Sequence, residues 1–287
     1  MGIDYFLYVA FGAGLLAGRL IRWRGPALTW ATSATVVVLL FALGASLAPS
    51  IGPSTVGTIL LSVGYAALIL ALTLAFVRLL PRPQPTAGAP PTNRPASSRW
   101  IGLVFLASVV VGGVVGSLVS VPTAQVLTWA LYVLLFLVAF GLVLSTHGLS
   151  HVWVTVGGAV AGATVAALVF AALTGVTVAV SFAVAFGFAW YTLAGPLVGA
   201  SAGASLGLLA FLTNFLRENL TMLTSPVLGR RVRGEGLSAM GGAASMDTVL
   251  YFVTRYGDPE AGPLALATGL ILTLTASVVL PLFLGPS

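Results

Sequence analysis

A charge pair lies inside an apolar stretch of the chain, in the sequence FLTNFLRENLTM at residues 211–222. If residues 211–226 are helical, polar residues recur at spacings of three and four and form one stripe: Asn214, Arg217, Glu218, Thr221 and Ser225. Because an ionised side chain is costly in an apolar medium unless it is paired or faces water, the stripe should face the interior of the protein. Two roles stay open for Glu218: it neutralises an arginine to hold two helices together, or it binds a substrate or a proton.

A second acidic candidate, Asp247, follows the sequence GGAAS at residues 241–245. Ser245 could cap the N-terminus of a helix there, and Asp247 could stabilise the helix dipole in the first turn. A half-helix that starts inside the membrane would also expose N–H groups able to bind a substrate carboxylate, and the two roles are compatible. We expect solvated positions for the remaining acids: Asp4, Glu235, Asp258 and Glu260.

Patterns typical of enzymes and metal sites are weak in this chain. GASAG at 199–203 and GASLG at 203–207 fit the motif of a nucleophilic serine, but the strand–turn–helix context that the motif needs is missing. His147 and His151 lack a third ligand and should form a solvated loop pair. We therefore predict no enzymatic activity, no metal site and no cofactor.

The composition places these residues in a membrane. Hydrophobic residues make up 59% of the 287 residues and charged residues only 6%, too few charges to cover a water-facing surface. All twelve basic residues are arginines, and no basic patch interleaved with aromatic residues suggests nucleic-acid binding. The net charge of +6 is better explained by membrane orientation.

Apolar runs long enough to cross a bilayer predict six spans in the first part of the chain, near residues 5–22, 28–48, 57–79, 100–120, 124–145 and 152–174. Arginines follow the first and third spans, so both loops should be cytoplasmic, and the N-terminus should be outside. A further span at 262–284 returns the C-terminus to the outside. The expected fold is an all-α integral membrane protein with about eight transmembrane helices plus broken or re-entrant segments.

The predicted organisation has three parts. Residues 1–80 hold the first three helices, residues 81–99 form a Pro-rich cytoplasmic linker, and residues 100–287 hold the other helices with a broken-helix substrate site. The breaks are expected at 187–203 and 236–247, where glycine, proline and serine interrupt the apolar sequence.

An internal repeat crosses the linker, because ALTWATSATVVVLLFALG at 27–44 resembles VLTWALYVLLFLVAFG at 126–141. A repeat unit of three spans would make the second copy inverted, as in many secondary transporters. Chance similarity between two Leu-rich helices remains the alternative. The glycines of residues 12–18 and 112–116 should be helix-packing surfaces.

Three sequences, GFAWYTLAGPL, NFLRENLTM and GGAASMDTVLYFVTRYG, resemble the C-terminal motifs of the LysO-type L-lysine exporter family. The resemblance is concentrated in residues 185–275 and implies an inner-membrane exporter that exchanges L-lysine for protons. It implies importance for Glu218 and Asp247 and draws attention to Trp190, Tyr191, Arg217 and Ser245. The chain departs from the family pattern at Ala189, where a glycine is expected, and at Asn214, where relatives can carry an acid.

A cationic amino acid suits these residues, because its ammonium group needs a carboxylate and its α-carboxylate needs N–H groups or a cation. We therefore expect a secondary active exporter of L-lysine in the cell membrane, working by proton antiport and alternating access, with a homodimer left open. Two alternatives remain: a sodium-coupled carrier of an anionic metabolite, which would need an inward Arg217 or Arg255, and a non-transporting membrane scaffold.

Overall fold

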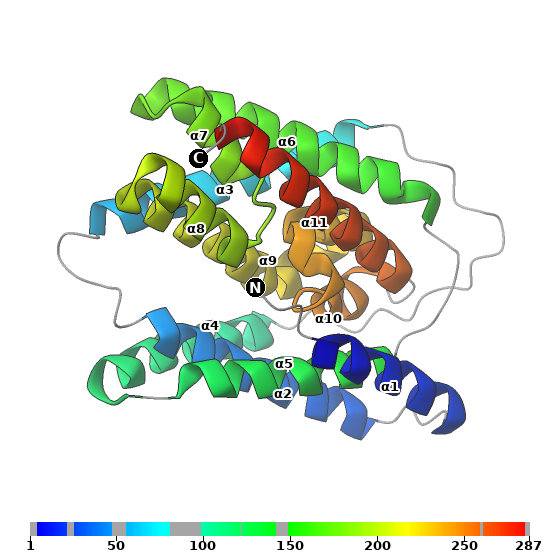
Figure 1. Cartoon of the computed structure of the whole chain (residues 1–287). Helices are drawn as coiled ribbons and strands as arrows, with labels where there is room; N and C mark the ends of the chain where they lie inside the picture. Colours follow the sequence, from blue (N-terminus) through cyan, green and yellow to red (C-terminus); the bar gives the residue numbers. More distant parts are fainter. Residues whose placement is uncertain are drawn as a thin grey trace. The chain divides into compact units, whose positions relative to one another are not determined.

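Helices form all the regular secondary structure in the computed structural model, which describes residues 5–21, 26–47, 56–80, 99–120, 122–141, 149–258 and 261–284 (Figure 1). The predicted Pro-rich linker, apart from Arg99, and His147, Asp4 and Glu260 lie outside these residues. The first six helices are α1 (Tyr5–Ile21), α2 (Pro26–Leu47), α3 (Val56–Leu79), α4 (Arg99–Leu118), α5 (Thr123–Gly141) and α6 (Val152–Thr174), the last preceded by the short η3 (Leu149–His151). They coincide with the six predicted spans to within a few residues.

The C-terminal part contains shorter and interrupted elements. These are α7 (Val178–Ala185), α8 (Tyr191–Ala202), α9 (Ala204–Gly241), the 3-10 helix η4 (Gly242–Met246), α10 (Leu250–Phe252), the π-helix η5 (Val253–Gly257) and α11 (Gly262–Leu284). Three described helical segments are long and apolar enough to cross a membrane: Val56–Leu79, Leu149–Thr174 and Gly262–Leu284. The chain is thus an α-helical protein with the composition of a membrane protein.

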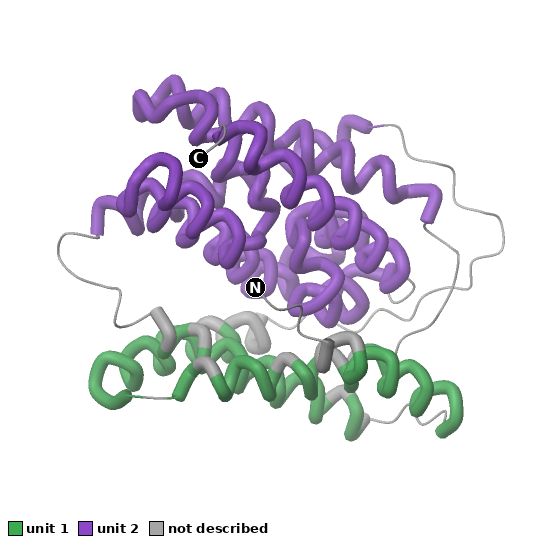
Figure 2. Tube along the Cα trace, in the orientation of Figure 1, with its two compact units in different colours: residues 1–53, 98–144 green, residues 54–97, 145–287 purple. Residues whose placement is uncertain are grey.

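The chain forms two units, and each combines segments from both sides of the predicted linker (Figure 2). One unit contains residues 1–53 and 98–144, and the other contains residues 54–97 and 145–287. In the first unit α1 packs against α5, and α2 packs against α4 and α5. In the second unit α3 packs against α6 and α9, which come much later in the sequence. Helices that are neighbours in the sequence are therefore not always neighbours in space.

Glycines bring the helices of the first unit close together, as the sequence predicts. A Cβ would clash with a facing backbone carbonyl at four of these positions: Gly14 against Phe136, Gly18 against Phe140, Gly112 against Phe41 and Gly116 against Ala45. Gly12 has open space around it and takes no part in this packing.

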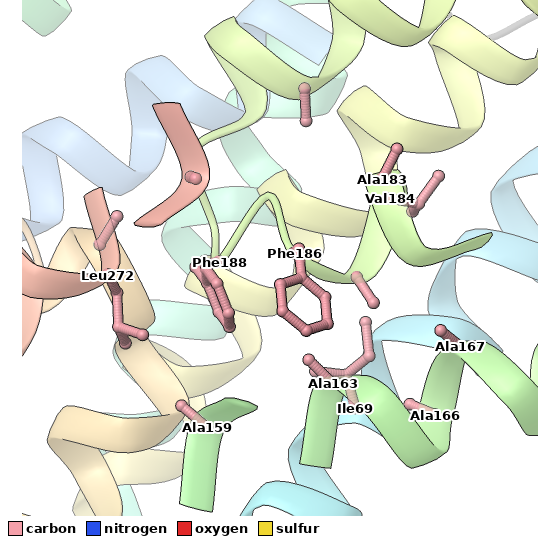
Figure 3. Packing of buried hydrophobic residues seen from close by; sticks show 14 of the residues in the cluster. Ile69, Ala159, Ala163, Ala166, Ala167, Ala183, Val184, Phe186, Phe188 and Leu272 are labelled. Carbon is pink, nitrogen blue, oxygen red and sulfur yellow. The ribbon is translucent and has the colours of Figure 1, made fainter. Parts of the chain in front are cut away.

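The core of the second unit surrounds the interruption between α7 and α8. Ala159, Ala163 and Ala166 of α6 are fully buried, and their small side chains leave room for Phe186 and Phe188 from the interrupted segment (Figure 3). This apolar packing holds residues 186–190 in a defined, non-helical conformation.

Candidate functional site

The polar stripe of α9 faces the interior of the second unit, as expected. Asn214, Arg217, Thr221 and Ser225 have no exposed surface, and Glu218 is 4% exposed. The backbone of α9 is continuous at these residues, and its one non-helical residue, Arg233, comes later. The stripe therefore carries buried polar groups that need partners inside the protein.

The interruption predicted at 187–203 is present but shorter, at residues 186–190, because residues 191–202 form helix α8. Helix α7 ends at Ala185, α8 begins at Tyr191, and between them Phe188 (φ 45°) and Ala189 (φ 70°) have left-handed backbone conformations. A left-handed conformation favours glycine, in agreement with our expectation of a glycine at the position of Ala189.

Asn214 supports this interruption. Its side-chain oxygen accepts a hydrogen bond from the Ala189 N–H (2.8 Å), and its amide nitrogen donates to the Val184 carbonyl (2.9 Å) and the Ala210 carbonyl (3.0 Å). Both amide hydrogens are used by the backbone, so this side chain holds the broken segment in place.

Arg217 binds the end of its own long helix. Its Nε donates to the Met240 carbonyl (3.0 Å) and its Nη2 donates to the Ala239 carbonyl (3.1 Å), while the guanidinium lies 5.5 Å from the Phe188 ring centroid. A cation is favourable beside the carbonyls of a helix C-terminus. Its Nη1 is buried and has no hydrogen-bond partner among the residues that the structure describes.

Glu218 makes a different contact from that of its neighbour Arg217. Its Oε1 accepts a hydrogen bond from the Thr248 hydroxyl (2.5 Å). Ion pairs join His151 with Glu235 and Arg233 with Asp258, and neither of these pairs includes Arg217 or Glu218. The interpretation of Glu218 as the neutralising partner of an arginine therefore finds no support in the geometry.

Thr248 also binds the second candidate acid. The Asp247 Oδ1 accepts from the Thr248 backbone N–H (2.5 Å) and lies 3.1 Å from the Thr248 hydroxyl oxygen. Glu218 and Asp247 are close enough to interact electrostatically. One hydroxyl thus stands between two carboxylates that are far apart in the sequence.

Tyr191 completes this group as the first residue of α8. Its ring packs edge-on against Phe211 and Phe215 of α9, at centroid distances of 5.2 and 5.5 Å. The Tyr191 side chain interacts electrostatically with Glu218 and with Asp247. A carboxylate pair beside a phenol can accept hydrogen bonds from a cationic donor such as an ammonium group.

The interruption expected at 236–247 is also confirmed, and it meets the first one. Helix α9 ends at Gly241, η4 begins at Gly242 (φ 62°), and the N–H of Ala243 donates to the Phe188 carbonyl (2.7 Å). The two broken segments are therefore joined by a backbone hydrogen bond.

Ser245 and Trp190 have supporting positions. The Ser245 hydroxyl lies 2.8 Å from the carbonyl oxygens of Gly242 and Ala265, so the expected N-cap is wrong, because Ser245 lies inside η4 and bonds to carbonyls. Trp190 is the residue before α8, and its side chain packs against the hydrophobic core. The structure brings Glu218 and Asp247 together through Thr248 and places Tyr191 where it interacts electrostatically with both acids.

Two acids that we expected to be solvated are instead partly or fully enclosed. Glu235 is 5% exposed and lies 2.5 Å from Nδ1 of His151, because the start of α6 packs beside the end of α9. Asp258 accepts from the Gly234 N–H (2.9 Å), next to Arg233, whose φ of 60° breaks the helix. Sequence spacing gave no signal for either pairing, since the partners are distant in the chain.

Comparison with protein families identifies the chain. The sequence model of the lysine exporter LysO family matches residues 106–284, which include every residue of the site described above. The chain belongs to the LysO family of lysine exporters. A comparison with curated proteins finds no significant match. The LysO family is a family of transporters, in agreement with the apolar helices of the chain.

Proposed function

We propose that this protein is a secondary active exporter of L-lysine that exchanges lysine for protons by alternating access. The observation that carries the proposal is the acid pair of buried Glu218 and partly buried Asp247, joined through Thr248, in a chain of the LysO family. An acid pair within apolar surroundings is costly unless it serves a cation. Lysine and the proton are the two cations that a lysine antiporter must bind.

The two ends of the substrate require different partners. The ε-ammonium group would bind the acid pair, where Tyr191 can orient it. The α-carboxylate needs hydrogen-bond donors. Nη1 of Arg217 is a buried donor without a partner among the described residues, and it can bind this carboxylate. The irregular backbone around Phe188 and Ala243 provides further polar groups between the helix ends, as in transporters with discontinuous helices.

Helix packing supports an inverted repeat of α1–α3 and α4–α6. If α1 corresponds to α4 and α2 to α5, the contact of α1 with α5 corresponds to the contact of α4 with α2, and both contacts occur. The details also correspond. Gly14 faces the carbonyl of Phe136, Gly112 faces the carbonyl of Phe41, and each phenylalanine ends the sequence LLF of its own copy. Helices that are alike only in composition would have no reason to share these contacts.

The arginines imply an orientation for the membrane helices. Arg19 and Arg78 lie in the last turns of α1 and α3, so those ends should face the cytoplasm. About eight crossings of the inner membrane would then place both termini outside, and would put the break at Arg233 near the cytoplasmic end of α9. The protein could work as a monomer or as a homodimer.

Counterflow in proteoliposomes tests the function directly. Purified protein is reconstituted with unlabelled amino acid inside, and uptake of labelled lysine is followed against a panel of cationic, neutral and anionic compounds. We expect lysine to drive uptake, and a pH gradient, not a sodium gradient, to drive accumulation. Uptake of an anion under a sodium gradient would instead support an anion carrier, and no uptake of any compound would support a scaffold.

A further inference from the structure

Thr248 is in an unusual position for hydrogen bonding. Its hydroxyl oxygen lies 2.5 Å from the Glu218 Oε1 and 3.1 Å from the Asp247 Oδ1. A threonine hydroxyl has one hydrogen to donate, whereas an ionised carboxylate can only accept. With both acids ionised, Thr248 can donate to only one of them, and the other contact joins two oxygens with no hydrogen between them.

A single added proton removes this conflict. When the proton binds to one carboxylate, the new O–H donates to the Thr248 oxygen, and the Thr248 O–H donates to the other carboxylate. The three oxygens of Glu218, Thr248 and Asp247 then share two hydrogens in one continuous chain. An ammonium group removes the conflict differently, because it brings its own N–H donors to both carboxylates.

From this geometry, we propose that Thr248 is the coupling residue of the acid pair, which makes the pair hold either one proton or one substrate ammonium group but not both. The proposal rests on the proposed lysine–proton exchange and goes beyond it by naming the residue that makes the two cations compete. Mutually exclusive occupancy of one site gives antiport when the empty site does not reorient across the membrane, because each cation can then cross only in exchange for the other.

The neighbouring polar groups have other partners or other interactions, so Thr248 is the group that couples the two acids. Tyr191 of α8 interacts electrostatically with both acids, and the guanidinium of Arg217 donates to the carbonyls of Ala239 and Met240. Other titratable groups on elements that pack against α9 have partners elsewhere: Tyr65 of α3 donates to the Ser181 carbonyl, His151 contacts Glu235, and Tyr256 of η5 interacts with Tyr251 and Arg255. Thr248 is the hydroxyl that these interactions place in contact with both acids.

The test compares two rates in proteoliposomes: lysine counterflow, which needs lysine binding, and lysine accumulation driven by a pH gradient, which also needs proton coupling. Thr248→Val keeps the shape of the side chain and removes the hydroxyl, and Thr248→Ser keeps the hydroxyl. We expect the ratio of pH-driven accumulation to counterflow to fall about tenfold or more in Thr248→Val, as a lost hydrogen bond to a charged group predicts, and to stay at the parental value in Thr248→Ser.

Thr254→Val is the matched control, because the Thr254 hydroxyl donates only to the backbone carbonyls of its own helical turns, Leu250 and Tyr251. If Thr248→Val does not fold, Thr248→Ala provides the same comparison without a branched side chain. A parental ratio in the folded valine or alanine variant would overturn the role of Thr248. Absence of lysine counterflow in the parental protein would overturn the proposed function itself, so the two failures can be told apart.

Discussion

Neighbouring residues of one polar stripe have separate tasks. Arg217 binds carbonyls at the end of α9, Glu218 binds Thr248, and Asn214 binds the interrupted segment between α7 and α8. Adjacent positions on a helix point about 100° apart, so Arg217 and Glu218 cannot share one partner. The apparent charge pair in the sequence is thus two independent buried groups.

Glu218→Gln should remove lysine transport. Glutamine keeps the size of the side chain but removes the negative charge and the exchangeable proton, so lysine flux and its response to a pH gradient should fall together, by about tenfold or more. Transport in proteoliposomes measures both. Asp247→Asn removes the negative charge but keeps an oxygen that can still accept the Thr248 N–H bond. We therefore expect weaker binding or weaker folding in this variant. A glutamine variant with parental flux and pH response would show that Glu218 is structural only.

Asn214→Ala should destabilise the protein, because it leaves the Ala189 N–H and the Val184 carbonyl without their partner. Unsatisfied buried groups of this kind cost about 1–3 kcal/mol each, so we expect a lower melting temperature in detergent. Asn219→Ala is the matched control, since the Asn219 amide donates to the carbonyl of Phe215 within its own helix. Equal melting temperatures for the two variants would contradict the bridging role of Asn214.

At the level of elements, the site depends on two interruptions that meet. Residues 186–190 connect α7 to α8, and Gly242 connects α9 to η4. The Ala243 N–H donates to the Phe188 carbonyl, so each interruption gives the other a partner for its backbone. This junction sets the positions of Tyr191 and Asp247.

Gly242→Ala should disturb this junction. Its φ of 62° disfavours any residue with a Cβ, and a Cβ there would also clash with the Phe188 carbonyl. Gly175→Ala is the control, because Gly175 has a φ of 74° with open space around it and should show only the backbone cost of about 1–2 kcal/mol. Melting temperature and lysine counterflow should both fall further in Gly242→Ala than in Gly175→Ala. Equal decreases in the two variants would show that the contact with Phe188 has no influence.

At the level of the whole molecule, the proposed inverted repeat makes a prediction about topology. Two copies of three helices in opposite orientation place the segment after α3 on the opposite side of the membrane from the N-terminus. The proposed number of crossings then places the segment near Arg231 on the same side as the segment after α3, and the C-terminus on the same side as the N-terminus. The positive-inside rule places the arginine-rich segments in the cytoplasm.

Cysteine labelling tests this topology, and the absence of native cysteines makes it direct. Ser97→Cys in the Pro-rich segment and Arg231→Cys, at an exposed position of α9, should react with an impermeant thiol reagent only from the cytoplasmic side. Ser287→Cys at the C-terminus is the control and should react from the outside. Outside labelling of Ser97→Cys would contradict the predicted orientation of the helices, and labelling of Ser97→Cys and of a cysteine before α1 from the same side would contradict the inverted repeat.

The sequence alone determined the helices. Apolar length fixes where a chain can cross a bilayer, so the predicted spans from 5–22 to 152–174 and at 262–284 agree with α1–α6 and α11. Local composition also indicated both interruptions, because glycine and proline disfavour helix. Composition did not fix their bounds, since Pro196, Pro226 and Pro281 lie inside α8, α9 and α11. The spacing of polar residues at three and four positions also predicted which face of α9 is buried.

Only the tertiary structure decided which distant groups meet. Thr248 gave no signal in the sequence, and its contact with Glu218 spans 30 positions. The contact of Glu235 with His151 spans 84 positions and reverses the expectation that both are solvated. Such pairings depend on how whole helices pack, and periodicity within one helix has no information about the side chains of another.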